Sequence, residues 1–566
     1  MSELAGKKST KLFVNGVLIL TVFNVIEKII GLIYKIPMRS LLGGEGMGYY
    51  NAAYSIYVWF FMISTAGLPV AMSLMISRSR AGGNFREVKK IMRIAFFTFF
   101  TIGLCGMALL FFGAGWFSNL QKLEDCKYCI MALSPTLFFV CLTSAFRGYF
   151  QGHQVMWPTA VSQFLESLGK LVFGLIFAYY AISRGWELKY VAASAVFGLA
   201  AAVFCGMLFM FLTKLLYKTQ AVDAEFVRAD GETLPVASGG KLLKELVVIA
   251  VPVTLSSSVM SLANLIDAVV ISRRLQFSGF AEKAAAGLYG DYTTLAVSMF
   301  NLVPVLVYPI GYSLVPMLTA LLANKDDAGA KTTMASSLKI AALISMPAAV
   351  GMAALAKPIL SMIFSSANKA PEYLSPADYE LLAYKADTAA GLAAPLLSIL
   401  AVSSFLVSML AITNAVLQSH KKQHFPLISM LVGAGAKIAA SYFLIGNVHI
   451  GIFGAPISTD LCYIIVTVLN FYFCARHADF RPPLFATFGK PLIASALCGG
   501  AALGVYTLCA PLTSSVLLPT GAAIVAAALV YLAAVLALRA LGKEDFVFLP
   551  KGQSVYRLLS KCKLVK

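Results

Sequence analysis

The chain consists largely of apolar segments of roughly twenty residues separated by short polar connections, and we count about fourteen of them. A helix of this length spans the roughly 30 Å hydrocarbon core of a bilayer, where lipid offers no hydrogen-bond partner to an open backbone. Only 13% of the residues are charged, against about a quarter in soluble domains. The sequence therefore predicts an all-α integral membrane protein, with spans at 12–34, 49–76, 91–117, 130–150, 157–181, 191–216, 246–271, 288–322, 334–364, 390–417, 425–445, 450–474, 492–509 and 516–538.

Basic residues cluster in alternate connections, at 78–93, 214–244, 421–422 and 476–490, and again in the tail at 543–566. The positive-inside rule places these connections and both termini in the cytoplasm, which an even number of spans also requires. The net charge of +19 is therefore mainly a signal of topology, and we do not expect nucleic acid as a partner.

The two halves of the sequence repeat each other. The end of the fourth span, RGYFQGHQVMWP, matches the end of the tenth, NAVLQSHKKQHFP, and a lysine follows at the same distance in both. The matching residues are Gln151, His153 and Lys170 in the first copy and Gln418, His420 and Lys437 in the second. This pattern predicts two pseudo-symmetric six-helix lobes, 1–220 and 241–480, a cytoplasmic linker at 221–240, and two further helices with a basic tail at 481–566. Parallel repeats of this kind predict a substrate site near the middle of the membrane and alternating access.

The first span carries a line of polar and basic side chains. Asn24, Lys28, Lys35 and Arg39 are spaced so that they share one face of a helix with 3.6 residues per turn. A charge among lipid tails costs roughly 2.5 kcal/mol or more, so this face is expected to meet protein or water rather than lipid. Lysine and arginine at such a place suit a phosphate or pyrophosphate anion. The alternative is that Lys35 and Arg39 reach the membrane interface and that Lys28 pairs with a carboxylate.

Other polar residues at membrane depth are fewer. Glu166 and Lys170 have the i,i+4 spacing of a helical ion pair, which we favour over a ligand contact. Asp267 is a candidate for binding a coupling cation or a proton, with a salt bridge as the alternative. Arg273 and Lys437 are further candidate substrate contacts. We expect no metal site and no organic cofactor, and we interpret the GGEGMG run at 43–48 as a tight turn.

Three runs, KIIGLIYKIPMRSLLGGEGMGYYNAAYSIY, AGLPVAMSLMISR and RGYFQGHQVMWPTAVSQFLE, resemble the polysaccharide-transport branch of the multidrug/oligosaccharidyl-lipid/polysaccharide flippase superfamily. Within it the chain is most similar to the stage V sporulation protein B type and its lipid II flippase relatives, and the resemblance covers nearly the whole chain. It implies an anion contact at Lys28, where relatives have an arginine, whereas a second family arginine falls on Tyr34. Some relatives couple to sodium through acids on spans seven and eleven, where this chain offers Asp267 and Lys437.

The resemblance implies a flippase of the bacterial plasma membrane, not an enzyme, that exports an undecaprenyl-pyrophosphate-linked saccharide, typically the peptidoglycan precursor lipid II. Such a protein would serve cell wall biogenesis, cell shape or sporulation, and we expect it to act as a monomer among membrane lipids. A flippase for capsule or exopolysaccharide units and a multidrug cation antiporter of the same fold are the alternatives. The antiporter would need acids rather than a row of cations to attract its cargo. A membrane glycosyltransferase and a structural scaffold fit the buried charges and the repeats less well.

Overall fold

The computed structural model describes residues 2–216, 235–513, 515–542 and 545, with only the backbone described for 2–25, 256 and 259–260. The chain divides into two compact units, unit 1 with residues 1–273 and unit 2 with residues 274–566. Most of the predicted linker at 221–240 lies outside the described residues, so the lobe boundaries drawn from the sequence stay predictions. The boundary between the two units falls inside a helix, directly after Arg273.

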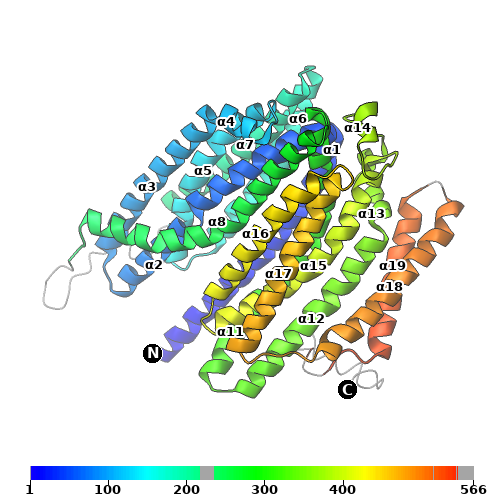
Figure 1. Cartoon of the computed structure of the whole chain (residues 1–566). Helices are drawn as coiled ribbons and strands as arrows, with labels where there is room; N and C mark the ends of the chain where they lie inside the picture. The colour runs from blue at the N-terminus through cyan, green and yellow to red at the C-terminus, as the bar shows by residue number, and fades with distance from the viewer. Residues whose placement is uncertain (1, 217–234, 514, 543–544, 546–566) are drawn as a thin grey trace. The chain divides into compact units, whose positions relative to one another are not determined.

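Unit 1 has helix α5 at its centre, buried along most of its length against α1, α2, α3 and α7. Helices α6 and α7 also pack together, and glycines let their backbones come very close. A Cβ atom on Gly198 of α7 would lie 2.4 Å from the Cα atom of Gly174 of α6. The helices of this unit are α1 (Ser2–Thr65), α2 (Gly67–Ala81), α3 (Phe85–Phe112), α4 (Ala114–Gln121), α5 (Cys126–Gly152), α6 (Trp157–Ser183), α7 (Leu188–Leu216) and α8 (Gly239–Phe277), whose last residues belong to unit 2 (Figure 1).

Helix α1 is divided by a kink at Gly43. Its 64 residues would extend about 96 Å at 1.5 Å per residue, far beyond a hydrocarbon core of about 30 Å. Gly43 has φ 64° and ψ −171°, a combination that glycine adopts far more readily than any other residue. Helix α1 therefore consists of two arms, one before and one after Gly43. The predicted tight turn at 43–48 is a kink at its first residue only, because residues 44–48 already belong to the second arm.

Unit 2 encloses its main apolar core between α11, α12, α15 and α17, where Leu314, Leu338 and Ile412 are fully buried. Helices α18 and α19 pack on each other, and α18 also packs on α12. The elements are α9 (Glu282–Asp291), η1 (Tyr292–Ala296), α10 (Val297–Phe300), α11 (Leu302–Ala323), α12 (Asp327–Ala354), α13 (Ala356–Ile363), η2 (Ser365–Asn368), α14 (Pro376–Glu380), α15 (Ala389–Ser419), α16 (His424–Ile445), η3 (Gly451–Phe453), α17 (Gly454–His477), η4 (Phe485–Gly489), α18 (Lys490–Cys509), η5 (Ala510–Leu512) and α19 (Leu517–Ala537).

The predicted eighth span, 288–322, is wrong as a single helix, because the structure divides it into several elements. A π-helical turn, η1, follows α9. The helix is interrupted at Asn301, between α10 and α11, where the side-chain amide of Asn301 donates a hydrogen bond to the carbonyl of Val297 (2.7 Å). The prolines of this stretch lie beyond the break. Pro304 is in the first turn of α11, where a missing N–H costs little, and Pro309 and Pro316 lie inside that helix.

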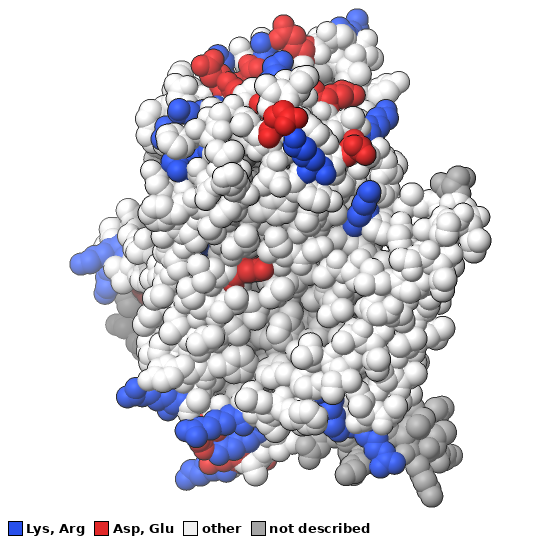
Figure 2. All heavy atoms as spheres, turned by 45° about the vertical axis from the view of Figure 1, so that its right-hand side comes forward, with Lys and Arg blue, Asp and Glu red and all other residues white. Residues whose placement is uncertain are grey.

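Twelve helices of the described residues are long and apolar enough to cross a membrane, with Ile26–Ala81 counted as one. Apolar side chains are often exposed on them: Phe443 of α16 is 72% exposed and Val468 of α17 is 62% exposed, as expected for contact with lipid. Figure 2 shows that uncharged side chains make up most of the visible surface. The protein is therefore a multi-pass integral membrane protein.

The same helix ending occurs in both units, at residues that the predicted repeat matches. His153 follows α5 and His420 follows α15, and each ring Nδ1 donates to the backbone carbonyl four residues earlier at 2.8 Å. The next residues, Gln154 and Lys421, both have φ of 60°. Burial lowers the pKa of His153, so its ring is neutral at physiological pH and carries the proton on Nδ1.

A carboxylate fixes the long connection between α13 and α15. Asp378, on α14, accepts hydrogen bonds from the N–H of Ala281 (2.8 Å) and from the N–H and the hydroxyl of Ser375 (3.1 and 2.5 Å). Burial alone would raise the pKa of Asp378, but the hydrogen bonds outweigh it and hold this pKa below its ordinary value of 3.8. The stabilisation is therefore present above pH 3.8 and is lost as the pH falls through the folded-state pKa.

Replacing Asp378 with asparagine is expected to loosen this connection at neutral pH, because the amide keeps the shape of the carboxylate but not its charge. We expect trypsin to cleave after Lys385 about tenfold faster in Asp378→Asn than in the unchanged protein. The matched control is Asp387→Asn, which neutralises an exposed acid of the same connection and should leave the cleavage rate unchanged. Equal rates in all three proteins would show that the Asp378 carboxylate does not hold the connection.

Candidate functional site

Three tyrosine rings surround the ammonium group of Lys170 in unit 1. The Nζ atom of Lys170, on α6, lies 4.7 Å from the ring centre of Tyr54, 5.1 Å from that of Tyr34 and 5.8 Å from that of Tyr50. Aromatic faces at such distances attract a cation electrostatically. Lys170 and these three tyrosines are called the tyrosine cage below.

The tyrosine cage is built from α6 and from both arms of α1. Tyr34 lies on the arm before the kink, whereas Tyr50 and Tyr54 lie one turn apart on the arm after it. Tyr34 fits against α6 because the residue one turn beyond Lys170 is Gly174, where a Cβ atom would lie 2.8 Å from the Tyr34 hydroxyl. The rings also contact each other, with centres 6.2 Å apart for both Tyr34–Tyr50 and Tyr50–Tyr54.

Glu166 forms a buried ion pair with Arg147 of α5. The guanidinium donates to the carboxylate at 2.8 Å and to the hydroxyl of Ser162 at 3.0 Å, and the two charged side chains are 12% and 15% exposed. Helix α7 closes the site, since a Cβ atom on Gly206 would lie 2.7 Å from the Glu166 side chain. The prediction that Glu166 pairs with Lys170 is therefore wrong, because the partner of Glu166 is Arg147. The carboxylate is taken by a guanidinium from a neighbouring helix, and the lysine lies against aromatic rings instead.

Lys28 and Lys35 add positive charge to the same part of unit 1. Lys35 is half-buried and Lys28 is exposed, both on the first arm of α1. Lys170 interacts electrostatically with both lysines and with Glu27. Because the ion pair of Glu166 is neutral as a whole, three lysines remain beside one acid, and the formal charge of this part is positive. A positive site within membrane-spanning helices suits an anion.

The other predicted site residues are spread over both units. Arg39 is buried in unit 1, with 5% of its surface exposed. On α8, Asp267 is half-buried and Arg273 is exposed, whereas Lys437 is half-buried on α16 of unit 2. Asn24 lies outside the residues whose side chains are described. The roles assigned to these five residues stay predictions.

The sequence analysis missed Arg147 and the tyrosines as members of the site. The tyrosines leave a readable signal, since Tyr50, Tyr54 and Tyr57 recur at intervals of four and three and so share one helical face. No spacing relates Arg147 to Glu166, because the two lie on different helices. Only the packing of α5 against α6 and α7 reveals that pair.

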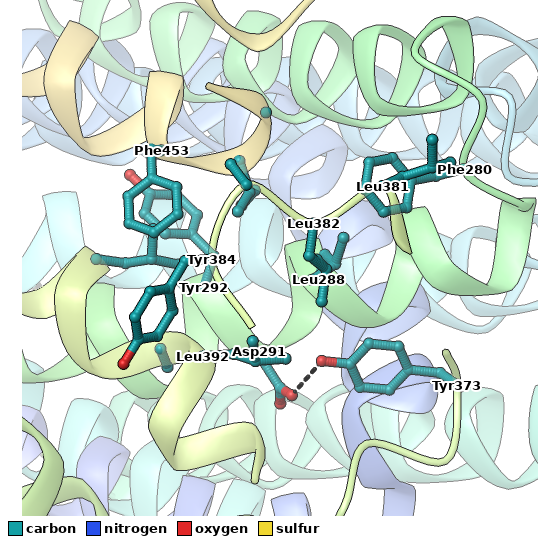
Figure 3. Close-up of a pocket in the computed structure, with 15 residues that line it drawn as sticks. Phe280, Leu288, Asp291, Tyr292, Tyr373, Leu381, Leu382, Tyr384, Leu392 and Phe453 are labelled. Atoms are coloured by element: carbon teal, nitrogen blue, oxygen red, sulfur yellow. Dashed lines mark hydrogen bonds between the residues drawn. The ribbon is translucent and has the colours of Figure 1, made fainter. Parts of the chain in front are cut away.

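A separate pocket lies within unit 2, under the connection that carries α14. Figure 3 shows the hydroxyl of Tyr373 directed at the buried carboxylate of Asp291, to which it donates a hydrogen bond of 2.8 Å. Gly287 leaves room for this ring, since a Cβ atom there would lie 2.2 Å from it. The remaining lining is mostly apolar or aromatic, as at Tyr384 and Phe453, and contains none of the predicted substrate contacts. Across the described residues, no group of three or more His, Cys, Asp or Glu side chains is placed to hold a metal ion.

Comparison with solved structures gives the fold of the chain. The lipid II flippase MurJ in an inward closed conformation matches with a TM-score of 0.65 and 13% identity, over 91% of this chain and 98% of that chain. A multidrug resistance MATE family transporter of the MOP superfamily, in an inward-facing conformation, matches with a TM-score of 0.63 and 15% identity, over 81% and 95%. At these identities the likeness establishes the fold alone, which is the fold that these two proteins share.

Sequence comparison then gives the family. Residues 13–322 match the family described as polysaccharide biosynthesis protein, so the chain belongs to this family of the MOP flippase superfamily, which consists of transporters rather than enzymes. Two relatives come from Bacillus subtilis (strain 168). The lipid II flippase MurJ is 25% identical over 484 residues, covering 83% of this chain and 84% of the relative. Stage V sporulation protein B is 23% identical over 459 residues, covering 81% and 82%. The resemblance stated from the sequence is confirmed.

Proposed function

We propose that the protein is a flippase that moves a polyprenyl-pyrophosphate-linked saccharide to the outer leaflet of a bacterial plasma membrane. The observation that carries this proposal is the excess of lysines at Lys28, Lys35 and Lys170, all within membrane-spanning helices of unit 1. Lipid II is the first candidate cargo, because relatives that cover most of this chain are a lipid II flippase and a stage V sporulation protein. Capsule or exopolysaccharide units carry the same anionic group and remain the alternative cargo.

The chemistry follows from the charge of the cargo. A pyrophosphate enters the membrane region only where basic groups replace its water, and lysine ammonium groups do so as point charges. The polyprenyl tail stays in lipid while the head group is taken up from the cytoplasmic side and released outside, in a cycle of alternating access. A membrane potential negative inside favours outward movement of an anion, by about 2.3 kcal/mol per charge per 100 mV.

The proposed topology has fourteen crossings with both termini in the cytoplasm. It counts the 56 residues of Ile26–Ala81 as two crossings, because they are more than twice as long as the roughly 20 residues that one crossing needs. It adds α8, whose 39 residues are long enough for another. The alternation of basic connections along the sequence supports the cytoplasmic assignment of the termini.

Reconstitution into sealed proteoliposomes tests the proposal. Lipid II with a fluorescent sugar is expected to reach the outer leaflet manyfold faster than in protein-free vesicles, and faster still with an outward-favouring potential. The same vesicles are tested with another undecaprenyl-pyrophosphate-linked saccharide and with sodium and proton gradients, since Asp267 is the proposed site for a coupling ion. If the protein transports neither lipid-linked saccharide, the proposal is contradicted. If the transport rates do not change with the sodium gradient or the proton gradient, Asp267 has no role in binding a coupling ion.

A multidrug cation antiporter is the second candidate, because a MATE transporter shares the fold. It predicts efflux of a fluorescent organic cation from the same vesicles. Lys28, Lys35 and Lys170 argue against the antiporter, because their positive charges repel a cationic cargo. Cation efflux without movement of any lipid-linked saccharide would decide for the antiporter.

A further inference from the structure

Two hydroxyl groups of the tyrosine cage are buried without a hydrogen-bond partner in the described part of the chain. Tyr34 is 2% exposed and Tyr50 is 3% exposed, and the hydroxyl oxygens of both lack a partner. The two hydroxyls interact with each other, and no other described residue pairs with either of them. Buried hydroxyls almost always have a partner, because leaving one unpaired costs stability. Two unpaired hydroxyls side by side therefore call for a ligand that the folded chain does not itself supply.

The third group of the cage, the Lys170 ammonium, points to the chemistry of that ligand. Its aromatic neighbours among the described residues are the faces of Tyr34, Tyr50 and Tyr54, and no oxygen of those residues accepts a hydrogen bond from it. Glu27 of α1 attracts it through charge. The one carboxylate on the same face of α6, that of Glu166, is already taken by Arg147. Three potential donors thus belong to one cage, and no described side chain accepts an ordinary hydrogen bond from the Lys170 ammonium.

We propose that the Lys170 ammonium and the hydroxyls of Tyr34 and Tyr50 form a subsite for a phosphate oxygen. This subsite rests on the proposed function, and it adds to Lys28 and Lys35 a contact that acts through hydrogen bonds as well as charge. A phosphate oxygen accepts from all three groups at once, whereas a metal cation is repelled by Lys170 and by the neighbouring lysines. The pyrophosphate of the cargo is the ligand we assign, and the phosphate of an ordinary phospholipid is the other source of the same chemistry.

The aromatic faces give Lys170 a defined resting place before the ligand arrives. Cation–π contacts hold an ammonium group without offering it an oxygen, so the lysine does not need to break an ion pair to reach the phosphate. A lysine paired with Glu166 would have to give up that pair first. The buried pair of Glu166 with Arg147 thus keeps Lys170 available.

Tyrosine-to-phenylalanine variants test the subsite because they remove only the unpaired hydroxyls. Binding is measured in phosphatidylcholine nanodiscs with undecaprenyl pyrophosphate, undecaprenyl phosphate and phosphatidylglycerol as probes. Tyr34→Phe and Tyr50→Phe are each expected to weaken undecaprenyl pyrophosphate binding by about tenfold. Their melting temperatures should equal or exceed that of the unchanged protein, because a buried unpaired hydroxyl has been removed. The matched control is Tyr179→Phe, an exposed tyrosine of the same helix as Lys170, which should change neither quantity.

The outcomes separate the subsite from the function. Unchanged affinity in both phenylalanine variants, with undecaprenyl pyrophosphate still bound by the unchanged protein, overturns the subsite and leaves the flippase proposal intact. Failure of the unchanged protein to bind either undecaprenyl lipid overturns both. Phosphatidylglycerol binding that is as tight as undecaprenyl pyrophosphate binding, and equally weakened by Tyr34→Phe, overturns the assignment to the cargo in favour of a phospholipid headgroup. Lys170→Gln should reduce the preference for pyrophosphate over monophosphate, which a purely structural role would leave unchanged.

Discussion

Replacing Arg147 with methionine is expected to destabilise the protein by about 3–5 kcal/mol, because it leaves the Glu166 carboxylate buried without its partner. Glu166→Gln should be at least as damaging, since a guanidinium cannot escape the interior by losing its proton. The double variant Arg147→Met with Glu166→Gln removes both charges. It should recover much of the loss, because a buried pair is worth little more than well-packed neutral side chains. The melting temperature of the purified protein in detergent ranks the three variants.

An exposed ion pair of the same unit provides the control. Lys189 pairs with Glu187 at 2.6 Å, and Glu187 is 69% exposed, so Lys189→Met makes a comparable exchange where water can solvate the remaining carboxylate. Its melting temperature should stay close to that of the unchanged protein. If the two single variants at the buried pair lose no more than Lys189→Met, then the Arg147–Glu166 pair does not hold α5 to α6.

The pair also shows what the sequence could and could not predict. Glu166 was recognised as a buried charge in need of a partner, but helical spacing ranks only partners on the same helix, and so favoured Lys170. The actual partner, Arg147, comes from α5, and its choice depends on how α5, α6 and α7 pack together. Interhelical contacts of this kind carry no periodic signal in a single sequence.

Features that depend on the local chain were predictable. The membrane class followed from the length of the apolar segments, and the kink at Gly43 followed from the glycine run. The repeated helix ending at His153 and His420 followed from the matching residues of the two sequence segments. The break inside the predicted eighth span was not predictable, because it depends on the side-chain amide of Asn301 donating to the carbonyl of Val297 at the end of α10. Pro309 and Pro316 lie inside the helix that follows.

One position links the family resemblance to the folded site. The resemblance implies an arginine in relatives at the position of Tyr34, and the ring of Tyr34 lies 5.1 Å from the Lys170 ammonium. The cation near this position is therefore supplied by α6 instead of α1. A comparison of α1 alone would not count Lys170, the basic residue that α6 adds to this site.

Neutralising Lys28 and Lys35 together is expected to abolish transport while leaving the protein folded. Each lysine that contacts a phosphate is worth about 1.5–3 kcal/mol, or roughly tenfold to a hundredfold in affinity, so the loss in Lys28→Gln with Lys35→Gln should exceed about a hundredfold. The initial rate of lipid II movement in proteoliposomes measures it. The variant with Lys28→Arg and Lys35→Arg keeps both charges and should retain most of the rate, which distinguishes a need for charge from a need for the lysine side chains themselves.

The matched control for this double variant removes the same net charge elsewhere. Lys331 and Lys385 form exposed ion pairs with Asp479 and Glu380 in unit 2, so Lys331→Gln with Lys385→Gln lowers the protein's charge by the same amount without touching the lysines of unit 1. If both double variants slow transport equally, the overall charge of the protein governs the rate and the Lys28–Lys35 face is not a substrate contact. If only Lys28→Gln with Lys35→Gln fails, and its melting temperature is unchanged, the anion must pass these two side chains. Charge within unit 1 would then select the cargo, which is the property that separates a flippase for pyrophosphate lipids from a cation antiporter of the same fold.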